Sequence, residues 1–187
     1  MRDVLSSETG KPWAGWYVLA GRPFGTTILS TRADGYADMF ATQMKLVGSE
    51  AWTDLSGGAS GVLAHPADTY LADVIAMTGE PGEPKQFTTV TRATIAGKDI
   101  AQTIAWSTAA MEHGTKITGQ AGLVATSAAG SLYQMIWISG SDTAEELDAG
   151  RDTMNGDADY QGMIAQAGAD GLFLDGSVEA MVLVKMP

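Results

Sequence analysis

Two segments of the chain place core-type residues three or four positions apart, the spacing of one face of an α-helix. They predict helices over 36–47 and 100–112, ended by Gly48 and Gly114, with Asp99 as the N-cap of the second. The predicted faces are Tyr36, Phe40, Met44 and Val47 in the first helix, and Ile100, Ile104, Ser107 and Met111 in the second.

Other segments are rich in β-branched and aromatic residues, as strands are. In residues 132–139 both alternating sets of side chains are mostly apolar, which predicts a strand covered on both faces. The predicted strands are 13–20, 26–29, 51–55, 70–77, 87–95, 116–126, 132–139 and 178–185.

The second half of the chain reads as β-α-β-β-α-β, the ferredoxin-like order. Its second helical region begins at Thr143, which forms a capping-box pattern with Glu146, and continues in a short helix over 159–167. The order helix, Gly, strand, Gly-rich turn, strand, Gly occurs in both halves of the chain, which indicates a repeated unit.

We therefore predict an α+β fold of tandem ferredoxin-like repeats, with antiparallel sheets and helices on one face, forming an α+β barrel. Residues 1–12 are a predicted N-terminal tail. A shortened repeat spans 13–80, a Pro-rich boundary spans 81–85, and a complete repeat spans 86–187.

Composition narrows the choice of partners. The 187 residues carry a formal charge of −11, which opposes binding to nucleic acid. Without cysteine, no disulfide or thiolate site can form.

The polar first ten residues do not resemble a signal peptide, and no apolar run is long enough to span a membrane, so we expect a cytoplasmic protein.

The C-terminal sequence 157–168, followed by Phe173 and the apolar strand 178–184, resembles the end of dimeric α+β barrel proteins. That superfamily includes antibiotic-biosynthesis monooxygenase-like, EthD-like and NIPSNAP-like domains. The resemblance is clearest over 86–187. It implies that two ferredoxin-like sheets form a barrel with helices outside, either within one chain or between chains of a homo-oligomer, and that the barrel binds a small hydrophobic molecule. Some relatives are cofactor-independent oxygenases, others are haem enzymes and others are proteins without known activity.

Arg92 is the first candidate catalytic residue, because it is the one charge in a strand of threonines and apolar residues. A guanidinium directed into a barrel can stabilise a carboxylate, an enolate or superoxide. It can equally pair with one of the many acids. Tyr133 and Trp137 share a face of a neighbouring predicted strand, so we expect a substrate-binding cleft between them and Arg92.

Trp106 lies off the core face of its helix, where it either contacts substrate or packs in an interface. His113, the second candidate catalytic residue, lies at a helix end and is either structural or a general base. His113 or His65 could also be a haem ligand. We expect no metal site.

Three hypotheses follow. The first is a cofactor-independent monooxygenase-like protein acting on an aromatic or polyketide-type ligand. The second is a non-catalytic oligomeric protein whose aromatic residues serve packing. The third is a haem-binding protein. The sequence leaves open whether the chain is an enzyme.

Overall fold

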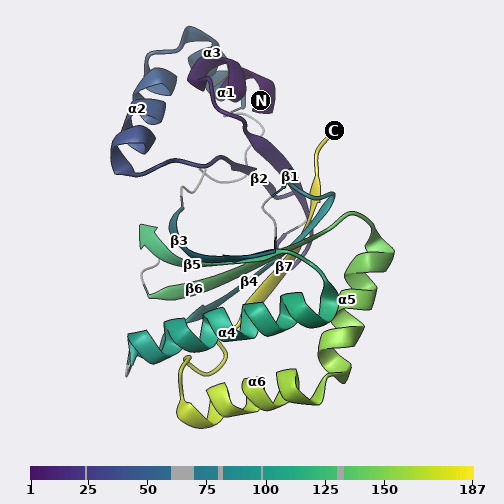
Figure 1. The fold of residues 1–187 in the computed structure, drawn as a ribbon. Coiled ribbons are helices and arrows are strands. Elements are labelled where there is room, and N and C mark those ends of the chain that lie inside the picture. The colour runs from purple at the N-terminus through teal and green to yellow at the C-terminus, as the bar shows by residue number, and fades with distance from the viewer. Residues whose placement is uncertain (24, 60–69, 80–81, 98, 130–132) are drawn as a thin grey trace. The chain divides into compact units, whose positions relative to one another are not determined.

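The chain has an α+β fold, in which helices pack on an antiparallel sheet (Figure 1). The computed structural model describes residues 1–187 except 24, 60–69, 80–81, 98 and 130–132. The elements are α1 (Arg2–Thr9), β1 (Ala14–Ala20), β2 (Thr27–Ser30), α2 (Tyr36–Val47), α3 (Glu50–Ala59), β3 (Leu71–Thr78), β4 (Phe87–Thr94), α4 (Ile100–Thr118), β5 (Gly122–Ala129), β6 (Gln134–Ser141), α5 (Ala144–Gly156), α6 (Ala158–Asp170) and β7 (Glu179–Lys185). The predicted fold class is confirmed.

The chain divides into two compact units. The first contains Met1–Tyr17, Thr27–Asp68 and Met186–Pro187, and the second contains Val18–Thr26 and Thr69–Lys185. The boundaries of these units differ from those of the predicted regions 13–80 and 86–187. That the two predicted regions are copies of one repeated unit stays a prediction. Pro81, in the predicted boundary, and His65 lie outside the described residues.

In the second unit, five strands pair in the order β7-β4-β6-β5-β3, and the last residues of β1 lie beside β7. The four strands β4 to β7 have the spatial order of a ferredoxin-like sheet, as their sequence order predicts. All four pairings among β3 to β7 are antiparallel. Strand β3 is therefore an edge strand of this unit.

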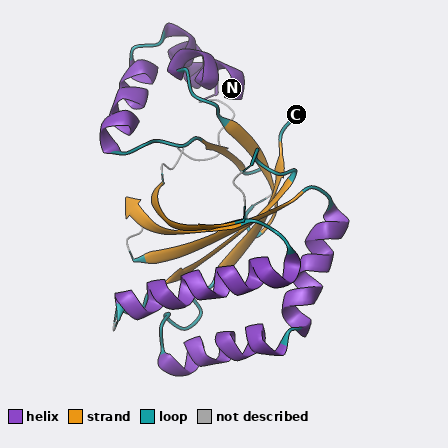
Figure 2. Ribbon diagram, in the orientation of Figure 1, coloured by secondary structure: helices purple, strands orange, loops and turns teal. Residues whose placement is uncertain are grey.

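The helices α4, α5 and α6 lie on one side of this sheet (Figure 2). Ile104 and Met111 of α4 pack against a core of Ile95, Val124 and Met135. Val124 and Met135 are fully buried. The opposite face of the sheet carries the side chains that alternate with these core residues.

The first unit packs α1, α2 and α3 together with a hairpin of β1 and β2. Polar side chains hold α2 in place: Asp38 forms an ion pair with Lys11, and the Lys45 ammonium donates to the Thr9 carbonyl at 3.0 Å. Thr42, on the same side of α2, is buried. The predicted apolar face of α2 is therefore not the core face: Tyr36, Phe40, Met44 and Val47 are 54–74% exposed.

Two predictions about the first half are wrong. The expected tail 1–12 contains helix α1, in which Leu5 is buried. The expected strand 51–55 lies inside α3, because Ser49 begins a helix there by accepting a hydrogen bond from the Trp52 amide at 3.0 Å.

Helix α4 also continues beyond its predicted end. Gly114 is buried inside the helix, beside Met154 and Tyr160, and the helix continues through it. The helix ends at Gly119, which has φ +73° and donates to the Thr115 carbonyl. Strand β5 consequently begins at Gly122 instead of at Lys116, the first residue of the predicted strand 116–126.

The predicted helix caps are confirmed. Asp99 accepts from the Gln102 amide at 2.9 Å, and Thr143 accepts from the Glu146 amide at 3.1 Å. In the part of the chain that the structure describes, no helix combines the length and hydrophobicity needed to cross a bilayer.

Candidate functional site

Strand register places Arg92 and Trp137 on opposite faces of the sheet. Arg92 pairs with Ile136 of β6 and Glu179 of β7, whereas Trp137 pairs with Thr91. Directly paired residues share a face and neighbours along a strand alternate. The expected cleft between Arg92, Tyr133 and Trp137 is therefore not formed, because Trp137 points toward the helices and Arg92 away from them.

Trp106 and Trp137 belong to an aromatic cluster on the helix side. Their rings meet edge to face at 6.2 Å, and Phe173 contacts the Trp106 ring at 5.5 Å and the Trp137 ring at 5.4 Å. The Trp106 indole N–H donates to the Met163 carbonyl of α6 at 3.0 Å. These contacts join α4, α6 and the sheet, so both tryptophans have packing partners within the chain.

His113 lies between α4 and the start of α6. Its Nε2 is 2.9 Å from Asp157 Oδ1, and its ring stacks on Tyr160 with centroids 6.3 Å apart. Hydrogen bonds from the Tyr160 amide and from His113 hold the pKa of Asp157 below its ordinary value. His113 therefore joins two helices and does not lie beside Arg92.

Arg92 takes part in a three-residue charge cluster on the strand face. Glu179 Oε2 accepts from Arg92 Nε at 2.9 Å, from Arg92 Nη2 at 2.6 Å and from Arg22 Nη2 at 3.1 Å. Arg22 reaches this place because Gly21 lets the chain pass very close to β7; a Cβ on Gly21 would be 2.1 Å from the Ala180 oxygen. Sequence analysis identified Arg92 but neither of its partners.

A phenol and an amide continue this polar end of the face. Gln134 lies opposite Thr94, which is on the same face of β4 as Arg92. The Tyr70 hydroxyl donates to Gln134 Oε1 at 3.1 Å, and burial raises the pKa of Tyr70 above its ordinary value, so this phenol keeps its proton at neutral pH. Tyr133 precedes β6 with φ 61° and is 61% exposed.

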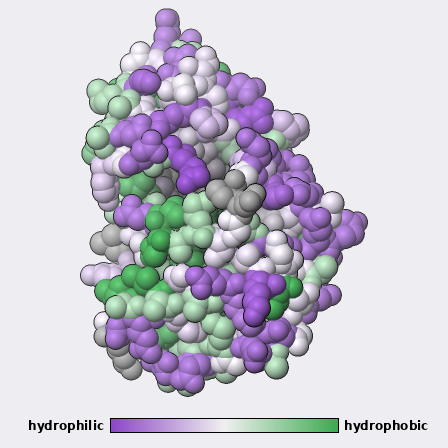
Figure 3. Space-filling view, viewed as in Figure 1, coloured by the Kyte–Doolittle hydropathy of each residue, from purple (hydrophilic) through white to green (hydrophobic). Residues whose placement is uncertain are grey.

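Apolar side chains form the rest of the strand face beside Arg92. They are Val90 of β4, Leu123 and Ala125 of β5, and Ile136 and Ile138 of β6. At its β3 edge, Val74 pairs with Ala125 and is 48% exposed. Figure 3 shows hydrophobic surface over β3, where Val74, Ile75 and Met77 are exposed. Ala125 and Ile136 are buried, Val90, Leu123 and Ile138 are half-buried, and the more exposed apolar side chains lie at the β3 edge, so the face combines a largely covered apolar part with one polar end.

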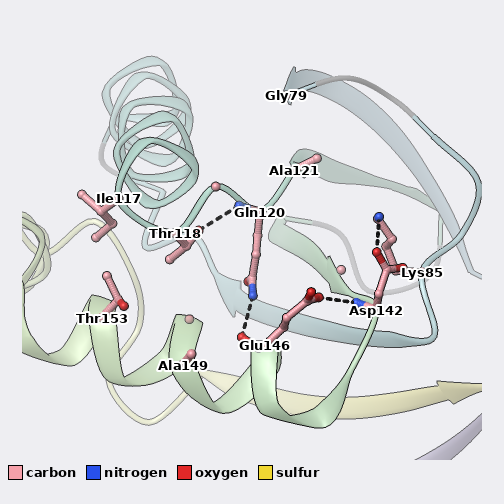
Figure 4. Close-up of a pocket in the computed structure, with 13 residues that line it drawn as sticks. Gly79, Lys85, Ile117, Thr118, Gln120, Ala121, Asp142, Glu146, Ala149 and Thr153 are labelled. Carbon is pink, nitrogen blue, oxygen red and sulfur yellow. Dashed lines mark hydrogen bonds and ion pairs between the residues drawn. The ribbon is translucent and has the colours of Figure 1, made fainter.

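A separate pocket of about 500 Å³ lies at the ends of α4, α5 and β6 (Figure 4). It contains none of the predicted site residues. Lys85 pairs with Asp142 at 2.7 Å, and Glu146 Oε2 accepts from the Asp142 amide at 2.8 Å. The hydrogen bond from Lys85 to Asp142 raises the pKa of Lys85.

The pocket is built mainly from backbone and small side chains. Gln120 crosses it to donate to the Glu146 carbonyl at 2.8 Å, next to Gly150, where a Cβ would be 2.7 Å from the Gln120 amide. Its charged groups engage one another, and its lining contains no aromatic ring. The strand face therefore offers the better site for an aromatic molecule.

Two solved structures share this fold at low sequence identity. A proposed monooxygenase of Fusobacterium nucleatum has a TM-score of 0.65 and 11% identity, covering 94% of this chain and 76% of its own. An anthrone oxidase-like protein has a TM-score of 0.65 and 14% identity, covering 100% of this chain and 82% of its own. No family model and no curated protein sequence matches the chain. The chain is thus similar in fold to monooxygenase-like α+β proteins.

Proposed function

We propose that the protein binds an aromatic or polyketide-type small molecule on the strand face of its second unit and oxidises it with dioxygen. The observation that carries this proposal is the placement of Arg92. Its half-buried guanidinium shares one face with the apolar side chains of β4, β5 and β6, and lies on the side of the sheet opposite α4. The two monooxygenase-like structural neighbours support the same reading.

The chemistry that fits this face uses the substrate as the source of electrons. Anthrone illustrates it: its ring methylene loses two hydrogens and gains one oxygen atom of O₂, and the other oxygen atom leaves as water. Negative charge develops on the ring oxygen when the methylene loses a proton. Arg92 would stabilise that charge.

This proposal requires no haem. His113, a candidate axial ligand, has its Nε2 on Asp157 and its ring on Tyr160, so ligation through that atom would break a helix-to-helix contact. Among the described residues, no group of three or more His, Asp and Glu side chains is placed to hold a metal ion.

The test combines binding and turnover. Anthracene methanol, a fluorescent neutral probe, is titrated into wild type, Arg92→Gln and the charge-matched control Arg151→Gln, whose arginine is exposed on α5. Anthrone oxidation is followed by oxygen uptake and anthraquinone absorbance. We expect wild type and Arg151→Gln to bind the probe and oxidise anthrone, and Arg92→Gln to lose about 100-fold in turnover.

Equal turnover in Arg92→Gln and Arg151→Gln would remove Arg92 from the mechanism. Absence of probe binding to wild type would remove the proposed site itself. That second result would favour the non-catalytic alternative, which the packing of Trp106 and Trp137 against Phe173 already supports.

A further inference from the structure

The cluster of Arg22, Arg92 and Glu179 carries an uneven charge. Two guanidinium groups contact one carboxylate oxygen, which leaves a net charge of +1 in a chain whose formal charge is −11. Two of the five arginines in the sequence are used here. An anion that contacts both guanidinium groups offsets the repulsion between them, so the cluster favours an anion at this position.

Glu179 supplies that anion from an exposed position. It is the first residue of β7, and its side chain is 54% exposed, compared with 22% for Arg92 and 36% for Arg22. The exposed carboxylate is open to a competing anion, although three hydrogen bonds hold one of its oxygens. The Arg92 side chain is the more buried member of the pair, and the tight approach at Gly21 keeps the backbone that carries Arg22 close to β7.

Polar and apolar side chains lie next to the three charged residues, where they could contact the ring of a flat anionic molecule. Arg92 is followed on its face by Thr94, whose partner Gln134 accepts from Tyr70. Ile136, directly opposite Arg92, is buried, and the next pair on this face, Val90 and Ile138, is half-buried; these side chains form the apolar part of the face. A ring lying on this apolar part would place an acidic substituent beside the two guanidinium groups.

We propose that Arg22 and Arg92 together bind the anionic oxygen of an aromatic ligand, a carboxylate or an enolate, and that Glu179 occupies the position of this oxygen when no ligand is bound. The inference rests on the proposed function, because it assigns a ligand class to the same face. It adds Arg22 as a specificity-determining residue and Glu179 as the group that the ligand displaces.

The experiment compares two probes that share one ring system and one point of substitution: anthracene carboxylate, which is anionic, and anthracene methanol, which is neutral. Affinities are measured by fluorescence titration for wild type, Arg22→Gln, Glu179→Gln and the control Arg151→Gln. Thermal unfolding of each variant checks that it is folded.

Wild type should bind the carboxylate about tenfold more tightly than the alcohol. Arg22→Gln should lose most of that preference, and Glu179→Gln should bind the carboxylate more tightly than wild type does, because the competing anion is gone. Both variants should change the affinity for the alcohol by less than they change the affinity for the carboxylate, and Arg151→Gln should bind both probes as wild type does.

Equal wild-type affinity for the two probes would overturn the inference and leave the proposed function standing, since the face would still bind an aromatic ring. Weaker carboxylate binding by Glu179→Gln would also overturn it, because Glu179 would then support the anion site instead of occupying it. Binding of neither probe would remove the proposed function together with this inference.

Discussion

Replacing Trp106 tests whether it serves packing or ligand binding. Trp106→Phe removes the hydrogen bond to the Met163 carbonyl and keeps a ring against Trp137 and Phe173. A hydrogen bond of this kind contributes about 1 kcal/mol, so we expect a loss of about 1–2 kcal/mol once the smaller ring area is included.

Trp106→Ala removes the ring pairs as well. Each aromatic pair adds about 0.5–1.5 kcal/mol beyond the area that it buries. Large aromatic-to-alanine changes in cores cost about 3–5 kcal/mol, and because Trp106 is half-buried we expect about 3 kcal/mol. The matched control is Phe40→Ala, since Phe40 is 58% exposed and its loss should change stability by less than about 0.5 kcal/mol.

Urea unfolding followed by circular dichroism measures these differences, and fluorescence titration with anthracene methanol measures binding. We expect Trp106→Phe to bind the probe as wild type does. A Trp106→Ala variant as stable as wild type would refute the packing argument. Weakened binding by Trp106→Phe without a loss of stability would assign Trp106 to the ligand site.

Three further predictions concern charge, backbone and haem. The folded-state pKa of Asp157 lies below its ordinary value of 3.8, so the stability that the Asp157 carboxylate contributes is complete above pH 3.8 and is lost as pH falls through the folded-state pKa. Asp157→Asn should therefore lower the Tm at neutral pH and reduce the fall of Tm with decreasing pH. A Tm profile identical to that of wild type would refute this prediction. Gly21→Ala should lower the free energy of unfolding, measured in urea, by more than about 2 kcal/mol, because φ at this position is +89° and the new Cβ would collide with the Ala180 oxygen. A decrease of less than about 0.5 kcal/mol would contradict that geometry. Haemin titration should produce no Soret band that depends on His113, and a band lost in His113→Ala would restore the haem hypothesis.

Much of the second unit could be predicted from local sequence patterns. The β-branched and aromatic content of residues 87–95 and 132–139, together with the caps at Asp99 and Thr143, identified the strands and helix starts of a ferredoxin-like order. These features depend on neighbouring residues, so they are readable without tertiary structure.

Other features depended on distant contacts. The sequence around Gly114 looks like a helix end, yet α4 continues through this buried glycine to Thr118, and the αL conformation of Gly119 ends it. On α2, periodicity correctly predicted the helix but not its exposed side, because Thr42 and the ion pair of Lys11 with Asp38 determine the side that packs.

The candidate site shows the same division. Arg92 stands out locally as a lone charge in a strand. Its partner Glu179 is 87 residues away, and only the β4–β7 register brings the two together. The β4–β6 register places Arg92 and Trp137 on opposite faces of the sheet. A register shifted by one residue would place them on the same face, and the sequence alone does not determine the register.

An NMR titration with anthracene methanol tests the central claim most directly, because the side-chain N–H groups of Arg92, Trp106 and Trp137 report on the two faces of the sheet separately. We expect the Arg92 Nε–H signal to shift with saturation and both indole signals to stay in place. Shifts of the indole signals with an unchanged Arg92 signal, or no shift in any of them, would contradict a ligand site on the strand face.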